Sequence, residues 1–227
     1  MNYTIEGGSL PVLTITLDAG EKIISEAGGR TWSKGEITTE NKIEGGAGKA
    51  LGRLVTGESL FMSTYTANGP AEIAFTNSFP GRIVARELAA GESIIAQKSA
   101  FLCASYGVTL AMHVNKSLKK GFLGGEGFLM QKITGPGIVF FEIDGYCKDY
   151  DLAPGEKLTI DTGVLALMDE TCTMDVQMVK GVKNVLFGGE GLFDTTITGP
   201  GKVSLQSMTV ANLAKLMIPY LPLGKNK

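Results

Sequence analysis

The feature that most constrains the fold is a pair of glycine-rich motifs that recurs at a nearly fixed interval. A Gly-Glu motif occupies residues 125–129 and 189–193, with a weaker copy at 57–61. A Gly-Pro pair follows each copy ten to twelve residues later. The three Gly-Glu motifs are separated by 68 and then 64 residues. Two different motifs in one order and at one period predict three copies of a single structural unit.

A second type of turn keeps the same interval. The sequence Ala-Gly-Glu or Pro-Gly-Glu occurs at 19–21, 90–92 and 154–156, between segments rich in apolar residues. Glycine adopts positive φ at little steric cost, so each site predicts that a strand enters, turns and leaves. The Gly-Pro-Gly segment at 135–137 separates two further apolar runs in the same way. We therefore expect a hairpin-like pair of strands around it.

These patterns predict an all-β protein with three pseudo-equivalent antiparallel units in one chain, in a β-prism-like arrangement. The expected units are roughly 1–79, 80–145 and 146–207, followed by a C-terminal helix and tail at 208–227. One unit of about 65 residues is marginal alone, whereas three units can share a continuous core. The helix is predicted from apolar residues at helical spacing, and we expect it to pack on the β body or on a neighbouring subunit. Those apolar residues are Val210, Leu213, Leu216 and Met217.

The charge and composition of the chain limit the classes of partner and the cellular compartment that we expect for it. The net charge is −2 with a pI near 5.6, so no overall basic field favours nucleic acid. The N-terminus lacks the plan of a signal peptide, and no apolar run approaches the roughly 20 residues of a membrane span. Cys103, Cys147 and Cys172 form no CxxC motif and are interpreted as buried thiols in a reducing compartment. We expect a soluble cytoplasmic protein.

The sequence offers few groups for catalysis or for binding a metal or cofactor. His113 is the only histidine, so a zinc site with two histidines is excluded. Glu58, Glu126 and Glu190 are equivalent in the repeat and are interpreted either as turn residues or as carboxylates around a hard cation. Equivalent positions carry the same residue type, whereas an active site needs different groups. We predict no catalytic residues, no cofactor and no metal.

Lysines precede the second and third Gly-Glu motifs and could line one end of the molecule. Bulky apolar residues stand beside them, so a cationic rim around apolar side chains is one hypothesis, and solvated loop charges are the alternative. A rim of this kind would bind an anion, a small ligand or a membrane surface. The lysines of this predicted rim are Lys116, Lys119, Lys120, Lys180 and Lys183.

The chain resembles a known family in several of these segments. The relevant residues are 54–61, the Gly-Gly-Glu-Gly segments 124–127 and 188–191, and the closing segment 216–222. They are similar to the family named for altered inheritance of mitochondria in yeast, which has uncharacterised bacterial and archaeal members. The resemblance implies a β fold like that of the tryptophan RNA-binding attenuation protein, without its tryptophan or RNA binding. It implies no catalytic residues.

Together these observations predict a non-catalytic scaffold or binding module. We expect it to assemble with copies of itself or with another protein through an exposed rim or an open sheet edge. The alternatives are an anion-binding or small-ligand-binding β protein that uses the lysine rim, and a protein peripherally associated with a membrane surface. An enzyme is not expected.

Overall fold

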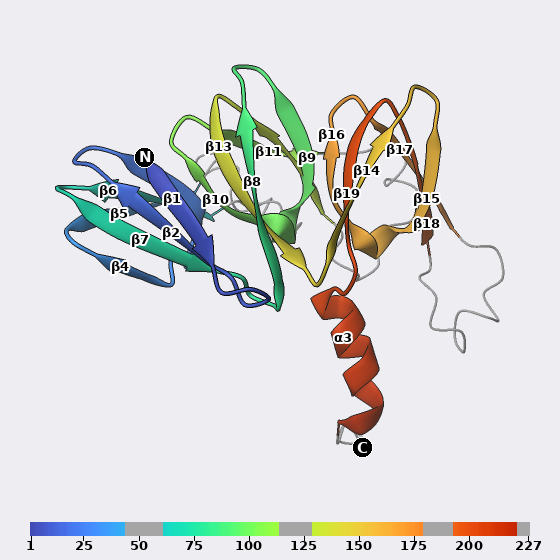
Figure 1. The fold of residues 1–227 in the computed structure, drawn as a ribbon. Helices are drawn as coiled ribbons and strands as arrows, with labels where there is room; N and C mark the ends of the chain where they lie inside the picture. Colours follow the sequence, from blue (N-terminus) through green and yellow to red (C-terminus); the bar gives the residue numbers. More distant parts are fainter. Residues whose placement is uncertain (44–60, 114–128, 179–192, 222–227) are drawn as a thin grey trace.

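A computed structural model describes residues 1–43, 61–113, 129–178 and 193–221. Within these ranges the chain forms antiparallel strands arranged in four sheets, with one short α-helix at the C-terminal end (Figure 1). The prediction of an all-β fold with a short C-terminal helix is confirmed.

The sheets are numbered here from the N-terminal end of the chain, and their strands are given in spatial order. The first sheet is β1 (Asn2–Glu6), β2 (Val12–Leu17), β7 (Ala71–Thr76) and β4 (Trp32–Lys34). The second is β5 (Ile37–Ile43), β6 (Phe61–Ala67), β3 (Lys22–Glu26), β10 (Phe101–Ser105), β13 (Gly137–Asp144) and β8 (Gly81–Leu88). The third is β11 (Thr109–His113), β12 (Met130–Thr134), β9 (Ser93–Gln97), β16 (Leu165–Asp169), β19 (Gly201–Gln206) and β14 (Cys147–Leu152). The fourth is β15 (Lys157–Asp161), β18 (Phe193–Thr198) and β17 (Thr173–Met178).

One pattern of strand pairing occurs three times along the chain. β2, β8 and β14 pair with β7, β13 and β19, respectively. β3, β9 and β15 pair in the same way with β6, β12 and β18. The second and third sheets are continuous across successive units because β3 also pairs with β10, and β9 with β16. The predicted boundaries of the three units, and their pseudo-equivalence in three dimensions, stay predictions.

Three apolar cores lie between successive sheets. The first core joins the first and second sheets, the second core joins the second and third, and the third core joins the third and fourth. The two middle sheets are therefore buried on both faces. In β13, Phe140 belongs to the first core and Phe141 to the second, and both are fully buried. Burial on both faces explains why the sequence of β13 is a continuous apolar run instead of an alternating one.

The Ala-Gly-Glu and Pro-Gly-Glu turns have the same internal hydrogen bonds in all three copies. The glycine has a φ of +87°, +81° and +78° at Gly20, Gly91 and Gly155. The glutamate side chain then accepts a hydrogen bond from the backbone N–H three residues earlier. The N···Oε2 distances are 2.9 Å for Asp18 to Glu21, 2.8 Å for Ala89 to Glu92, and 2.8 Å for Ala153 to Glu156.

The predicted hairpin-like pair around residues 135–137 is wrong. β12 and β13 flank this segment, but β12 pairs with β9 and β11 in the third sheet, whereas β13 pairs with β8 and β10 in the second. The segment carries the chain from one sheet to its neighbour. An added Cβ at Gly135 would lie 2.5 Å from the carbonyl oxygen of Ala89, so the corner is too crowded for a side chain.

The C-terminal helix α3 (Val210–Met217) begins at Thr209, whose hydroxyl accepts a hydrogen bond from the N–H of Asn212 at 3.0 Å. This is a conventional N-cap, and the helical spacing of the sequence is confirmed. The helix extends away from the sheets (Figure 1), and none of its residues is buried. The expected packing on the β body is therefore not observed.

Candidate functional site

The lysines predicted to form a rim lie outside the described residues. Glu58, Glu126 and Glu190 lie outside them as well. The choice between turn residues and cation ligands for these glutamates stays open. In the described part of the chain, no group of three or more His, Cys, Asp and Glu side chains is arranged to hold a metal ion.

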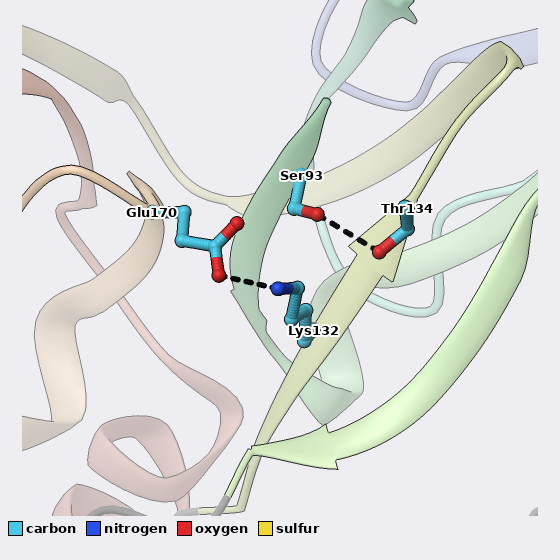
Figure 2. Close-up of polar contacts among 4 residues, drawn as sticks. All are labelled: Ser93, Lys132, Thr134 and Glu170. Carbon is cyan, nitrogen blue, oxygen red and sulfur yellow. Dashed lines mark hydrogen bonds and ion pairs between the residues drawn. The ribbon is translucent and has the colours of Figure 1, made fainter. Parts of the chain in front are cut away.

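His113 is half-buried at the end of β11, near an ion pair that links the third sheet to the turn after β16. Lys132 on β12 pairs with Glu170, and Ser93 and Thr134 share a hydroxyl hydrogen bond of 2.9 Å beside them (Figure 2). Burial lowers the pKa of His113 from its usual value, Glu170 opposes this shift and Lys132 adds to it. The imidazole is thus held mainly neutral near pH 7.

The three cysteines are free and buried. Burial raises the pKa of the thiols of Cys103, Cys147 and Cys172, and nearby carboxylates raise it further for Cys147 and Cys172. A thiol must ionise to act as a nucleophile. All three therefore favour the unreactive protonated form, and their interpretation as small buried residues is confirmed.

A groove of about 600 Å³ opens where β1, β8 and β14 approach one another. Its walls include Ile5 from β1, Arg82 and Ile83 from β8, and Tyr146 and Cys147 at the start of β14. These segments are far apart in the sequence. The groove therefore exists only because the three parts of the chain are stacked together.

A smaller hollow of about 230 Å³ shares part of this lining and adds Arg86 and Asp149. Arg82 and Arg86 are four residues apart on β8, so their side chains leave the same face of the strand. The carboxylate of Asp149 accepts a hydrogen bond from the hydroxyl of Ser204 at 2.6 Å and from the thiol of Cys147 at 3.7 Å. Within the described ranges, neither arginine forms a salt bridge with a carboxylate.

Arg82 and Arg86 give the groove two groups that suit an anion, and the carboxylates of Glu6 and Asp149 line the same two hollows. A guanidinium presents several N–H donors in a plane and binds carboxylates or phosphates through two hydrogen bonds at once. Two such groups beside apolar walls could hold a small anionic ligand that also carries an apolar part. Sequence reasoning missed Arg82 and Arg86, because nothing in the spacing of β8 indicates that β1 and β14 lie beside it.

Two partly buried carboxyls lie in the second sheet. Glu142 on β13 accepts hydrogen bonds of 2.7 Å from both the N–H and the hydroxyl of Ser78. Burial is the main cause that raises the pKa of Glu142, and it also raises the pKa of Glu26 on β3. Hydrogen bonding to Ser78 acts in the opposite direction. This arrangement fixes the connection between β7 and β8.

The last residues that the structure describes expose apolar side chains. Leu216 and Met217 at the end of α3 are 60% and 48% exposed, and Ile218, Tyr220 and Leu221 beyond it are exposed as well. Exposed apolar side chains that lie this close together in the sequence suit a contact with another molecule. No helix in the described ranges is long and apolar enough to span a bilayer.

The chain is similar to a known protein family and to a solved structure. A family model described as mitochondrial biogenesis AIM24 matches residues 3–208. An uncharacterized protein of Streptococcus pyogenes serotype M6, M6_Spy0233, is 28% identical over 235 residues, which cover 100% of this chain and 93% of that protein. The crystal structure of SPYM3_0169 from Streptococcus pyogenes superimposes with a TM-score of 0.80 at 24% identity, over 97% of this chain and 99% of the other.

Proposed function

The chain belongs to the AIM24 family, described as mitochondrial biogenesis AIM24, and from this membership and the geometry above we propose that it is a non-catalytic scaffold or binding module. It acts by contact with copies of itself or with another protein. The main support for this proposal is that α3 and the residues after it expose apolar side chains outside the sheets.

Two further observations support a role without catalysis. The thiols are held protonated by burial, and the one histidine of the chain lies beside an ion pair on a strand and lines neither hollow described above. The glutamates of the Ala-Gly-Glu and Pro-Gly-Glu turns, at 21, 92 and 156, each accept a hydrogen bond from the backbone N–H three residues earlier. Such groups stabilise a structure and leave little chemistry for a reaction.

The proposal is tested on the apolar segment. Leu216→Ser combined with Ile218→Ser removes exposed apolar surface and leaves the sheets untouched. We expect the double variant to lose the contacts made through this segment, measured by cross-linking in lysate. Ala214→Ser, also exposed on α3, is the matched control. A wild-type protein that stays a single chain and captures no partner would refute the proposal.

The second candidate function is binding of a small anion, and the groove beside β8 favours it. The specific observation is that Arg82 and Arg86 line one hollow and neither forms a salt bridge in the described residues, although Arg86 donates a hydrogen bond of 3.3 Å to the carbonyl of Ala85. The predicted lysine rim is a second possible location for the same chemistry, and its residues lie outside the described ranges.

Calorimetric titration with inorganic phosphate and with a medium-chain fatty acid distinguishes a purely ionic site from one that also uses the apolar walls. Arg82→Gln combined with Arg86→Gln should abolish binding at the groove. Lys157→Gln, an exposed cation on the fourth sheet, is the control and should bind as the wild type does. Unchanged binding by the double variant would place the anion elsewhere.

We also propose a cytoplasmic location, supported by three thiols that are free and not oxidised to disulfides. Fractionation of the native host tests this proposal. Flotation with anionic vesicles tests peripheral membrane contact, for which the exposed apolar residues at 216–218 are the surface to examine. Recovery of the protein with the vesicles would replace the protein-partner proposal by membrane association.

A further inference from the structure

The edge strands of the first and fourth sheets correspond to the two strands that pair with each other where successive units join. Within the chain, β3 pairs with β10 to complete the second sheet, and β9 pairs with β16 to complete the third. β15 pairs with β18 and so occupies the position of β3 and β9 in the third copy of the pairing pattern. β4 pairs with β7 as β10 pairs with β13 and β16 with β19, so β4 occupies the position of β10 and β16 in the first copy. Among the strands that the structure describes, both β15 and β4 are edge strands.

β4 and β15 lie at opposite ends of the row of sheets (Figure 1). They therefore cannot pair within the chain in this structure. A second copy, however, can bring its β15 to the β4 of the first. We infer that copies of this chain associate head to tail by antiparallel pairing of β15 with β4, which forms one continuous sheet across the contact.

This inference rests on the proposed role in assembly and names the surface and the partner. The two internal junctions also predict the register. At the first junction, Ile24 lies opposite Ala104, and at the second, Ile95 lies opposite Met168. On β15, Thr159 lies opposite the central residue of the paired part of β18 as Ile24 lies opposite that of β6. On β4, Ser33 lies opposite Ile73 of β7 as Ala104 lies opposite Val139 of β13. Thr159 and Ser33 are therefore the equivalent residues at the free edges. Transfer of the register therefore places Thr159 opposite Ser33.

The neighbouring pairs follow from the same alignment. Ile160 comes to lie opposite Trp32, and Leu158 opposite Lys34. Ile160 belongs to the third core, which ends at β15 in the isolated chain. The indole of Trp32 would extend that core across the contact. Trp32 is 47% exposed, whereas Cys103 and Leu167 at the equivalent positions are 0% and 1% exposed.

The backbone groups needed for pairing face outward. The N–H of Tyr106 donates to the carbonyl of Lys22 at 3.2 Å at the end of the first junction. Because directly hydrogen-bonded pairs alternate along an antiparallel ladder, Ile24 and Ala104 form the next such pair. By equivalence, Thr159 and Ser33 carry outward-facing N–H and C=O groups. An exposed edge of this kind is a template for another strand.

The polar side chains of these edges fit a contact that forms after folding. Thr159 and Ser33 are exposed in the single chain, whereas the residues equivalent to them are buried. Threonine opposite serine is a favourable cross-strand pair, and both tolerate water before association. The interface is heterologous, because a different edge is used on each copy. It closes into a ring or continues as a filament, depending on the rotation between copies.

Disulfide trapping tests both the partner and the register. Ser33→Cys and Thr159→Cys are made in separate full-length chains, mixed and oxidised. Their Cα atoms would lie about 5.5 Å apart as a hydrogen-bonded pair, which falls within the range of disulfides. The native cysteines are buried and do not compete. We expect a two-chain product only in the mixture.

The control mixes Ser33→Cys with Lys157→Cys, an exposed position two residues earlier on β15 and about 7 Å away along the strand. The matched pair should cross-link at least about tenfold faster, since the displaced pair exceeds the Cα separation that a disulfide allows. Sedimentation of the wild-type protein over a range of concentrations measures association without cysteine substitutions, and we expect a mass above that of one chain.

Three outcomes would overturn the inference, and they separate it from the proposed function. Association of the wild type with equal cross-linking of the two pairs would exclude the β15–β4 contact and leave a scaffold role intact. A single chain at all concentrations that still captures a protein from lysate would exclude a second copy as the partner. A single chain that captures nothing would refute both the inference and the proposed function.

Discussion

The pKa of His113 can be measured without overlap from other histidines, because it is the only histidine of the chain. The Hε1 proton of its imidazole should give one titrating signal in NMR, with a pKa lowered from the usual 6.5. Glu170→Gln should lower that pKa further, since Glu170 favours the charged imidazole, and Lys132→Met should raise it. Glu36→Gln in a distant part of the chain should leave it unchanged. A wild-type pKa at or above 6.5 would contradict the described burial.

The same shift affects stability. A histidine with a lowered pKa in the folded state binds its proton more readily when unfolded. Its contribution to stability is therefore present above the unfolded pKa and lost as the pH falls through the folded pKa. The Lys132–Glu170 pair is largely exposed, so its own contribution to stability is small.

Gly137 is a position where the backbone requires glycine. Its φ is +144°, and an added Cβ would lie 2.3 Å from the hydroxyl of Ser105 and 2.8 Å from a methyl of Val108. That hydroxyl also accepts a hydrogen bond from the N–H of Ile138 at 3.0 Å. Gly137→Ala should therefore lower the free energy of unfolding by about 2–4 kcal/mol.

Urea denaturation measures this loss. Gly163→Ala is the control, because its added Cβ would approach no heavy atom closer than 3.7 Å and its φ is not positive. We expect that control to change the free energy of unfolding by less than about 1 kcal/mol. Equal effects of the two substitutions would show that the corner after Pro136 tolerates a side chain.

At the scale of single elements, β13 is the strand on which two cores depend. Phe140 and Phe141 are adjacent in sequence and point into different cores, and both are fully buried. Phe140→Ala and Phe141→Ala should each lower the free energy of unfolding by about 3–5 kcal/mol. Tyr106→Ala, at a side chain that is 63% exposed, should cost less than about 1 kcal/mol. A large loss for only one phenylalanine would mean that one face of β13 is not packed.

The sequence predicted individual strands better than their partners. The sequence of β11 alternates as its burial does, with Leu110 buried and Thr109 and Ala111 exposed. The turns at 19–21 and 154–156 also form where glycine indicated them. The predicted strand pair around 135–137 failed because an apolar run, a turn and a second apolar run fit a hairpin and a crossing between stacked sheets equally well. β4 was not predicted, since three exposed residues carry no periodic signal.

At the scale of the whole molecule, each middle sheet contributes to two cores, so the parts of the chain should unfold together. Leu165 lies fully buried in the third core, and Trp32 lies at the edge of the first sheet. Leu165→Ala should lower the urea midpoint reported by Trp32 fluorescence and by circular dichroism equally. The expected loss is about 2–5 kcal/mol. A tryptophan transition that does not move would show that the first unit unfolds independently.

The groove beside β8 and the edges of β4 and β15 also depend on the arrangement of the whole molecule. Arg82 and Arg86 are ordinary residues of a β-strand until β1 and β14 close the groove beside them. The open edges of β4 and β15 are visible only when the pairings of all the strands are known. The lysines indicated by the sequence lie outside the described residues, so the predicted rim remains untested.

The sequence by itself determined the all-β class, the corners and the C-terminal helix. The conformation of a glycine, the helical spacing of apolar residues, and the hydrogen bond from a backbone N–H to the glutamate side chain three residues later each depend on residues within a few positions of one another. Only the tertiary structure decided which strands share a sheet, where the groove opens and which edges stay unpaired. Backbone N–H and C=O groups are the same in every strand, so a strand's partner is chosen by the packing of distant apolar faces and not by its own residues.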